Sequence, residues 1–280
     1  LLVAFAVMLV PCVFMGMPFP PAGRGRARLR AGTGGPVGDT AGLNTLGSIA
    51  GSLGAGFVLI PSLGLQRGML LAGALYVAWG ALVLAVALAP RTRAAHAIRL
   101  AGLAVAAAAF AFPFLAPRWE LGALATLAST QMQPYLQAGG RVDVASSLGS
   151  RRLLYYAEGS TSTISVVERR AHRSILVNGR AEASDFLPDL QVEFLLGHVP
   201  ALLHPRPRTA LVVGLGAGIS LGALTAHPDF ERITLVEIEP RVLGGTRQFS
   251  DLNDAALDDP RLEVVFQDGR NFLETSTQRF

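Results

Sequence analysis

The sequence predicts a multi-pass α-helical membrane segment followed by a small antiparallel β unit and a doubly wound α/β domain. Three observations predict this fold class. Residues 1–117 are dominated by apolar side chains and contain four stretches of about the length that crosses a bilayer. Residues 153–177 change to short runs rich in β-branched and aromatic side chains. Residues 209–268 then alternate apolar strands with a glycine-rich turn and helical segments.

These changes in composition divide the chain into four parts. We expect about four transmembrane helices over residues 1–117, a linker over 118–150, the β unit over 151–188 and the α/β domain over 189–280. The sequence starts inside an apolar run and stops without a closing element, so we treat it as a fragment whose α/β domain is incomplete at the C-terminus.

The composition argues against two classes of function. The net charge of +4 comes from arginine alone, since the chain has no lysine, and the arginines form no stripe with interleaved aromatics, so we expect no nucleic-acid partner. Cys12 is the single cysteine, and the five histidines show no helical pairing at i, i+3 or i, i+4. We therefore expect neither a disulfide within the chain nor a metal site.

The four apolar stretches are each about 19–21 residues, close to the ~20 that span a hydrocarbon core as a helix. They are Leu1–Pro20, Leu43–Leu63, Met69–Ala89 and Ile98–Ala116. Gly47, Gly51 and Gly54 give the second stretch a face for close helix packing, or part of a transport path. The apolar cores hold no acidic or basic residue, which argues against a self-sufficient transporter.

A short antiparallel β unit is predicted after the linker. Three runs carry the strand pattern; the turn-like sequence Glu158-Gly159-Ser160 lies after the first run and Asn178-Gly179 after the third. The runs are Leu153–Glu158, Thr161–Arg169 and Ser174–Val177. A helix is expected over Leu190–Leu203, ending before His204-Pro205.

The α/β domain is predicted from a strand that runs into a glycine-rich turn and a helix. The apolar run Thr209–Val213 reads as a buried parallel strand, and a helix to about Ala226 follows the turn. Gly214, Gly216 and Gly218 permit a tight turn and close contact between backbone and ligand. The N–H groups at the start of the helix are then free to bind that ligand.

Two further strands end in acidic residues. Ile233–Val236 is followed by Glu237, whose carboxylate oxygens can accept both hydroxyls of a ribose. Leu262–Phe266 is followed by Asp268 and Gly269, and the acid there can accept from an adenine amino group or cap the helix expected at Arg270–Thr275. A dinucleotide fingerprint would need glycine at position 219, so the pattern favours a nucleoside of the S-adenosylmethionine type.

In these segments the chain resembles the spermidine synthase family, and more narrowly its membrane-fused members. The resembling pieces include TALVVGLGAG, ITLVEIEP, DPRLEVVFQDGRNFL, LVNGRAEAS and GHVPALLHP. The resemblance implies a Rossmann-like fold of the S-adenosylmethionine-dependent transferase type and transfer of an aminopropyl group from decarboxylated S-adenosylmethionine to a polyamine-like amine. It implies that Glu237 holds the ribose and that Asp268 and Gly269 hold the adenine. It implies no metal.

The chain departs from the family pattern at several points. An aspartate of the family's glycine loop is replaced by Ala217, the family's Asp-Gly-x-x-Gln becomes Asn178–Glu182, and its Tyr-His-Glu stretch is not matched at Val192–Phe194. The family's catalytic aspartate follows the next strand, beyond Phe280, so the catalytic residue is unknown and we expect residues 1–280 alone to be inactive. Because a buried ammonium needs a partner, Ala217 leaves intact S-adenosylmethionine as an alternative donor.

Three functions therefore stay open. The first is a membrane-anchored aminopropyltransferase, the second an S-adenosylmethionine-dependent methyltransferase, and the third a non-catalytic membrane transport or sensor protein with a nucleoside-binding domain. The positive-inside rule places the arginine-rich loops after the first and third apolar stretches in the cytoplasm, and with four spans the soluble part would then lie outside. A cofactor made in the cytosol instead requires the soluble part to lie in the cytoplasm. We expect an integral protein of the inner or plasma membrane with a cytoplasmic soluble domain; a homo-oligomer stays open.

Overall fold

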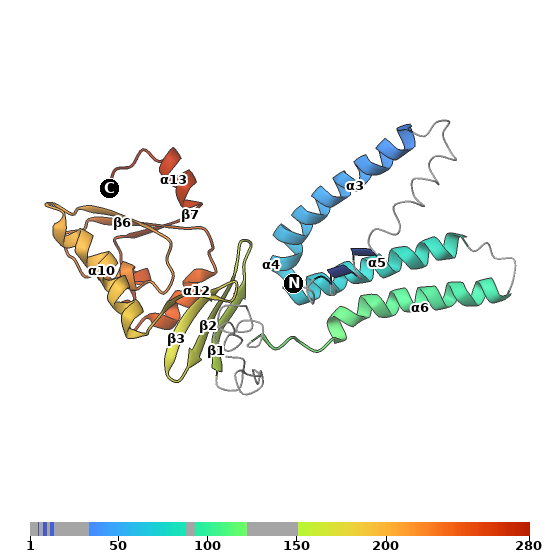
Figure 1. The fold of residues 1–280 in the computed structure, drawn as a ribbon, viewed down its shortest axis with the longest axis horizontal. Coiled ribbons are helices and arrows are strands. Elements are labelled where there is room, and N and C mark those ends of the chain that lie inside the picture. The colour runs from blue at the N-terminus through green and yellow to red at the C-terminus, as the bar shows by residue number, and fades with distance from the viewer. Residues whose placement is uncertain (1–4, 6–7, 10–11, 14–33, 88–92, 122–150) are drawn as a thin grey trace. The chain divides into compact units, whose positions relative to one another are not determined.

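The computed structural model describes residues 5, 8–9, 12–13, 34–87, 93–121 and 151–280 (Figure 1). The chain divides into two compact units, Leu1–Leu59 and Ile60–Phe280. Most of the first predicted span lies outside the described residues, and so does the linker apart from residues 118–121.

The first long helical stretch begins earlier than the sequence predicted. Helix α3 (Gly34–Gly54) continues through a π-helical turn, η1 (Ala55–Leu59), into the short α4 (Ile60–Leu63). Gly64 ends this stretch with a φ of 81°, a left-handed conformation that glycine adopts without steric cost. The predicted second span therefore forms as helix, with nine additional residues at its N-terminal end.

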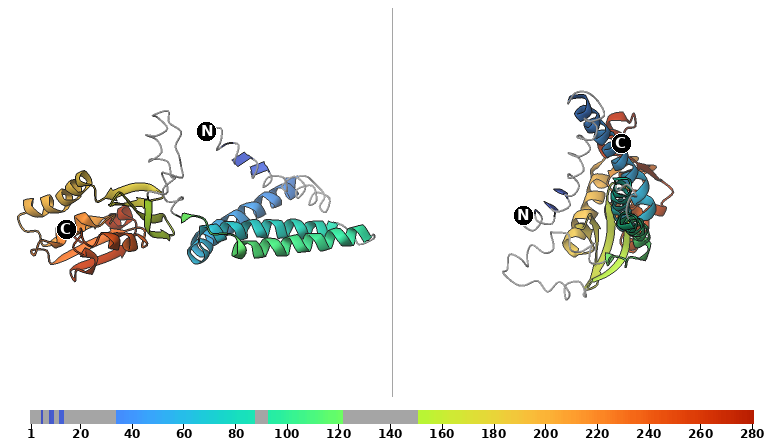
Figure 2. Two further views of the ribbon diagram at one scale, coloured as in Figure 1. Left: turned by 90° about the horizontal axis from the view of Figure 1, so that it is seen from below. Right: turned by 90° about the vertical axis from the view of Figure 1, so that its right-hand side faces the viewer.

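Helices α5 (Leu65–Ala87) and α6 (Arg93–Leu115) lie side by side as a hairpin (Figures 1 and 2). Small residues permit this packing: a Cβ added to Gly102 would lie 3.7 Å from the Cβ of Ala81. Pro113 lies in the last turn of α6, close to the end of the helix. These helices occupy the predicted third and fourth apolar stretches.

Within the described residues, two helical stretches are long and apolar enough to cross a membrane. They are Gly38–Leu63 and Ala94–Leu115. Of the most apolar 18 residues in each stretch, 0% are buried in the first and 6% in the second. Large side chains such as Leu46, Leu103 and Phe114 are accordingly exposed. Two such helices are weak evidence by length and composition alone, so the predicted four-span segment is not confirmed.

The β unit is a four-stranded antiparallel sheet in the order β1-β2-β3-β4. Its strands are β1 (Arg151–Glu158), β2 (Thr163–Arg169), β3 (His172–Val177) and β4 (Arg180–Ser184). Asn178 and Gly179 have φ of 51° and 77°, so the predicted two-residue hairpin turn joins β3 to β4. The sequence analysis missed β4 and placed the start of β3 two residues late.

The α/β domain begins with α10 (Leu187–Leu203), three residues before the predicted start, and the helix ends before His204 as predicted. Three parallel strands in the order β5-β6-β7 form its sheet. They are β5 (Thr209–Val213), β6 (Arg232–Glu237) and β7 (Leu262–Phe266). Between and after them lie α11 (Ile219–Thr225), α12 (Val242–Thr246), the 3-10 turns η2 (Arg247–Phe249) and η3 (Ala256–Asp258), and α13 (Gly269–Thr275).

One apolar core joins the β unit to the α/β domain. Ile164 of β2 and Ile175 of β3 belong to the same buried cluster as Val242 and Phe249. Gly245 permits this contact, since a Cβ there would lie 2.9 Å from the Cδ1 of Ile175. The β unit therefore packs directly on the α12 region, as the ribbon shows (Figure 1).

Arg173 of β3 makes the main polar connection across the same boundary. Its guanidinium donates to both carboxylate oxygens of Asp251 at 2.7 and 2.8 Å, to Asp185 at 3.0 Å and to the Gln248 carbonyl at 2.7 Å. It also lies 5.2 Å from the centre of the Phe249 ring. The bonds to Asp251 and Asp185 raise the pKa of Arg173, against the opposing effect of burial, so it is charged at all ordinary pH values.

We expect Arg173→Met to lower the free energy of unfolding of this part by about 3 kcal/mol, because it removes the guanidinium that pairs with the almost buried Asp185. Asp185 then keeps only the backbone N–H of residue 173 and the His172 ring as partners. Urea unfolding of the full chain in detergent, followed by proteolysis of the unfolded fraction, measures this change. Arg152→Met is the matched control, since the pair of Arg152 with Glu168 is exposed and contributes about 0.5 kcal/mol or less. Equal losses in the two variants would contradict the assignment.

Candidate nucleoside-binding site

The carboxyl ends of the three parallel strands meet at one edge of the sheet. The N–H of Gly214 donates to the Val236 carbonyl at 2.9 Å, and the N–H of Gln267 donates to the Glu237 carbonyl at 3.1 Å. The hydrogen-bond ladder thus continues one residue beyond β5 and β7. It places the glycine turn, Glu237 and the start of the Asp268 loop next to one another, which is where ligands of open α/β sheets bind.

Each glycine of the predicted motif has a backbone conformation that favours glycine. The φ angles of Gly214, Gly216 and Gly218 are 83°, 54° and 76°. Gly218 is also required by packing, because a Cβ there would lie 2.6 Å from the Cγ2 of Thr246. The prediction of a tight turn at these positions is therefore confirmed in its geometry, while the binding role stays a prediction.

Two buried polar side chains hold the glycine turn from behind, and the sequence analysis missed both. The Thr246 hydroxyl donates to the Gly216 carbonyl at 2.8 Å. The Asn253 amide donates to the Ala217 carbonyl at 2.9 Å and to the Thr246 carbonyl at 3.2 Å. No sequence signal near either residue links it to the turn, since the contacts cross 30 and 36 positions of the chain.

Glu237 ends β6 with a carboxylate that is fixed on both sides. The side chain is 8% exposed. One oxygen accepts the N–H of Leu215 in the glycine turn and the other accepts the N–H of Glu239, both at 2.9 Å. Each carboxylate oxygen has two acceptor sites, so one on each oxygen is available for a ribose hydroxyl.

Asp268 is exposed and caps α13. Its Oδ1 accepts the N–H of Asn271 at 3.0 Å, and its backbone is extended, as is usual at an N-cap. The capping role weighed in the sequence analysis is thus confirmed, and contact with an adenine amino group stays a prediction. Gly269 lies where a Cβ would come within 2.5 Å of the Val213 Cγ1, so close packing of α13 on β5 requires it.

Ala217 is fully buried in the apolar core cluster. The position at which the family carries an aspartate therefore presents no charge to this edge of the sheet. The glycine turn offers a ligand backbone groups only, which matters for the choice between donors.

Glu239 is a second buried acid that the sequence analysis did not single out. It is 3% exposed, and its carboxylate accepts hydrogen bonds from the Thr161 N–H and hydroxyl and from the Ser162 N–H at 2.7–3.2 Å. Burial alone raises the pKa of Glu239, but these bonds and one from the Arg241 N–H outweigh burial and hold it below its usual value. Glu239 therefore anchors the β1–β2 turn beside Glu237.

Two further acids lie on α10 near the end of β4. The Ser184 hydroxyl donates to the carboxylate of Asp189, and Glu193 is one helical turn further along. Burial, together with the charge of Asp189, raises the pKa of Glu193 from 4.5 to about 7. Glu193 lies in the stretch Val192–Phe194 that departs from the family's acceptor pattern.

The raised pKa of Glu193 predicts a pH-dependent stability. The folded state keeps the proton that the unfolded state loses above pH 4.5, so stability falls as the pH rises from about 4.5 to about 7. We expect Glu193→Gln to remove on the order of 1–2 kcal/mol of this decline, allowing for partial solvent exposure. Urea unfolding at several pH values measures it. Glu182→Gln, an exposed acid, should leave the decline unchanged; a decline that survives in Glu193→Gln contradicts the assignment.

Two of the histidines that looked scattered in the sequence meet in the structure. His198 Nδ1 lies 2.9 Å from His227 Nε2, and the rings pack edge to face. The packing of α10 on α11 brings these residues together across 29 positions. The described residues contain no group of three or more potential metal ligands, so the pair alone does not make a metal site.

The glycine turn and the fixed carboxylate of Glu237 lie together at this edge of the sheet. They define a Rossmann-like domain with a candidate nucleoside site. Residues 190–280 match the family model described as the spermine/spermidine synthase domain. Over these residues the chain is therefore similar to the spermidine synthase family.

Curated relatives show the same similarity. The polyamine aminopropyltransferase of Moorella thermoacetica is 32% identical over 127 residues, 45% of each chain. That of Streptococcus pneumoniae is 34% identical over 132 residues, 47% of this chain and 46% of the relative. The chain thus spans about half the length of the curated relatives it matches.

Solved structures with partial similarity include two spermidine synthases. One is from Thermotoga maritima, with 25% identity and a TM-score of 0.40 over 44% of this chain and 43% of that one. The other is a spermidine synthase in complex with the transition state analogue AdoDATO, with the same identity and TM-score over 44% and 42%.

Proposed function

We propose that this chain is part of a membrane-anchored aminopropyltransferase that binds decarboxylated S-adenosylmethionine. The main observation behind this proposal is that two backbone N–H groups fix the carboxylate of Glu237 beside the glycine turn. The family match over residues 190–280 supports the same proposal. Glu237 accepts the ribose hydroxyls, and Asp268 with Gly269 contacts the adenine.

The reaction is a displacement at the carbon bonded to the sulfonium. The nitrogen of a polyamine-like amine forms the new C–N bond, the C–S bond breaks with its electron pair going to sulfur, and the attacking nitrogen loses a proton to a base. The donor leaves as a neutral thioether nucleoside. The residues described supply the binding of the nucleoside and its orientation; the base is not assigned.

Ala217 favours a second candidate, methyl transfer from intact S-adenosylmethionine. The decarboxylated donor carries an ammonium at the end of its aminopropyl chain, and a desolvated ammonium needs an acidic partner. The buried methyl group of Ala217 supplies none. Preference between the two donors therefore separates the two candidate reactions.

Binding of the donor tests the proposal. Calorimetric titration of the full chain in detergent would compare decarboxylated and intact S-adenosylmethionine at matched concentrations. Tighter binding of the decarboxylated form supports aminopropyl transfer, and tighter binding of the intact form supports methyl transfer. Binding of neither form by folded protein would overturn the nucleoside site.

The membrane part of the proposal rests on the exposed apolar helices. The stretches Gly38–Leu63 and Ala94–Leu115 bury almost none of their apolar surface against the described chain, and a bilayer would cover it. Because the donor is made in the cytosol, the soluble domain faces the cytoplasm. Resistance of the protein to carbonate extraction, and protection of its soluble part from protease added to intact cells, are the expected results; release by carbonate contradicts the anchoring.

A further inference from the structure

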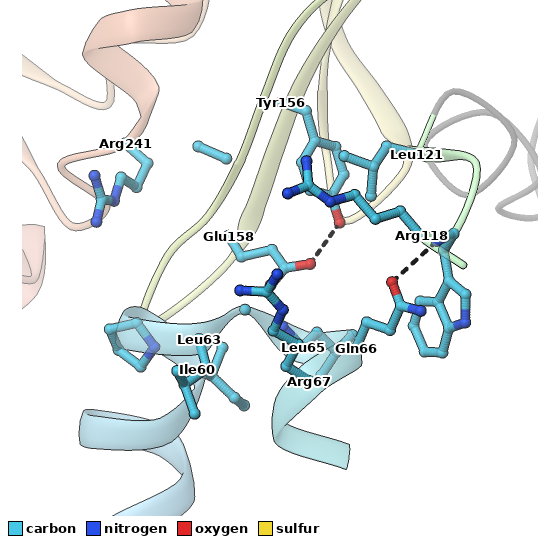
Figure 3. Close-up of a pocket in the computed structure, with 14 residues that line it drawn as sticks. Ile60, Leu63, Leu65, Gln66, Arg67, Arg118, Leu121, Tyr156, Glu158 and Arg241 are labelled. Atoms are coloured by element: carbon cyan, nitrogen blue, oxygen red, sulfur yellow. Dashed lines mark hydrogen bonds between the residues drawn. The ribbon is translucent and has the colours of Figure 1, made fainter. Parts of the chain in front are cut away.

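A cavity of about 440 Å³ lies between the start of α5, the segment after α6, and strand β1 (Figure 3). We call it the junction pocket. Its polar and aromatic lining consists of Gln66, Arg67, Arg118, Trp119, Tyr156, Glu158 and Arg241. The volume is in the range of small-molecule sites, and the pocket includes none of the residues assigned to the nucleoside site.

Hydrogen bonds between distant segments build this pocket. The Gln66 side chain donates to the Pro117 carbonyl at 2.7 Å and accepts the N–H of Trp119 at 2.9 Å, which ties the start of α5 to the chain after α6. The carboxylate of Glu158 on β1 accepts the N–H of Leu65. These contacts link the helical hairpin to the β unit through bonds that span 51 to 93 positions.

The pocket carries a net positive charge that the described chain does not neutralise. Glu158 is the single acid among its lining residues, against three arginines. That carboxylate is already occupied, since it accepts the N–H of Leu65 and, at 2.9 Å, the hydroxyl of Tyr156. Burial and the Glu158 carboxylate raise the pKa of Tyr156, so its hydroxyl stays protonated and keeps donating.

The arginines themselves are available for a ligand. Within the described part of the chain, the guanidinium groups of Arg67, Arg118 and Arg241 have no hydrogen bond or ion pair. In Figure 3, Arg67 extends from the start of α5 and Arg118 from the segment after α6, both toward the β1 edge at Tyr156 and Glu158. Guanidinium groups bind phosphate oxygens through paired N–H donors, so the arrangement suits a phosphate-bearing anion.

The position of the pocket indicates where that anion comes from. The apolar parts of α5 and α6 begin and end beside it, and arginine and tryptophan side chains are typical of the level where membrane helices meet the headgroups. Ile60, Leu63 and Leu121 add apolar lining that suits the glycerol and upper acyl region of a lipid. Basic pockets at the ends of membrane helices are known to bind anionic headgroups.

We propose that the junction pocket binds the phosphate of an anionic phospholipid headgroup. The proposal rests on the membrane anchoring proposed above and is independent of the donor and of the reaction. A lipid bound there contacts both the helical hairpin and the β unit, and so holds the soluble part against the bilayer surface.

Tryptophan fluorescence of the full chain tests this proposal, because Trp119 lines the pocket and the chain has only one other tryptophan, Trp79. In a Trp79→Phe background, the purified protein in neutral detergent is titrated with phosphatidylglycerol, with phosphatidylcholine and with inorganic phosphate. We expect a saturable change with phosphatidylglycerol, at least about 10-fold tighter than with phosphatidylcholine and weakened by added salt.

Charge variants assign the effect to the pocket. Arg67→Gln with Arg118→Gln should weaken phosphatidylglycerol binding by at least about 10-fold. Arg206→Gln, an exposed arginine in the loop before β5, is the matched control and should bind like the parent protein. The pair Arg67→Lys with Arg118→Lys keeps the charge and should retain part of the binding, which separates the charge of the two side chains from their guanidinium geometry.

Three outcomes would overturn the proposal. Equal binding of the two lipids, or no effect of the glutamine pair, would mean that the pocket does not recognise the headgroup charge. Saturation by inorganic phosphate at the same concentration as phosphatidylglycerol would assign the pocket to a free phosphate. A donor titration of the same preparation separates failure here from failure of the transferase proposal.

Discussion

Replacing Glu237 by glutamine is expected to weaken binding of an S-adenosylmethionine-type donor by about 100-fold, or about 2.7 kcal/mol. The carboxylate accepts two backbone N–H groups and, in the proposed complex, both ribose hydroxyls. Glutamine has only one acceptor oxygen. Its NH2 group, a donor, would replace the second carboxylate oxygen and could not accept a hydrogen bond from a backbone N–H or a ribose hydroxyl. Calorimetric titration of both proteins with the preferred donor measures the change.

A purely structural role for Glu237 predicts a different result. Loss of the bonds to Leu215 and Glu239 would lower the free energy of unfolding but leave the affinity of the remaining folded protein unchanged. Titrations at a temperature where circular dichroism shows both proteins to be folded separate the two roles. Glu263→Gln, an exposed acid on the neighbouring strand β7, is the control and should bind the donor normally.

The strands of the α/β domain could be predicted closely because their patterns are local. β5 and β7 have the predicted bounds, since each is a mainly apolar run followed by a turn. The prediction that β5 is buried was wrong, because its residues are only partly buried or exposed. The hairpin turn at Asn178-Gly179 was equally clear, because few residue pairs adopt positive φ at both positions. The same local chemistry predicted the glycine turn.

Elements with weak local signals were missed or misplaced. Strand β4 has the sequence Arg-Ala-Glu-Ala-Ser, with no β-branched or aromatic residue, and forms because it pairs with β3. The start of α10 was expected at Leu190 but lies at Leu187, with Pro188 in the first turn, where proline is favoured. For β4 the pairing with β3 outweighed a weak local pattern, whereas the start of α10 follows a local preference of proline.

The supporting residues of the site could not be predicted because their partners are distant in sequence. Asn253 and Thr246 hold the glycine turn only once α12 and the following segment have packed against α11. The meeting of His198 with His227 likewise depends on helix packing. Sequence patterns thus located the residues proposed to bind a ligand, while the fold supplies the hydrogen bonds that fix them in position.

Gly222→Ala should be the most damaging single change to this support. Gly222 lies in the middle of α11, and a Cβ there would come within 2.5 Å of the carbonyl oxygen of Asn253 and 2.8 Å of its Cα. Both are backbone atoms that cannot rotate away. The segment around Asn253 must therefore move, which separates its amide from the Ala217 carbonyl.

We expect Gly222→Ala to lower the free energy of unfolding by about 3 kcal/mol and to weaken donor binding in the protein that remains folded. Gly216→Ala is the matched comparison, because a Cβ there meets nothing closer than 3.9 Å and the cost is confined to a left-handed backbone, about 1 kcal/mol. Urea unfolding of both variants measures the difference. If the two variants lose the same free energy of unfolding, the contact between α11 and Asn253 adds no cost beyond that of a strained backbone at Gly216. That contact then does not position the site.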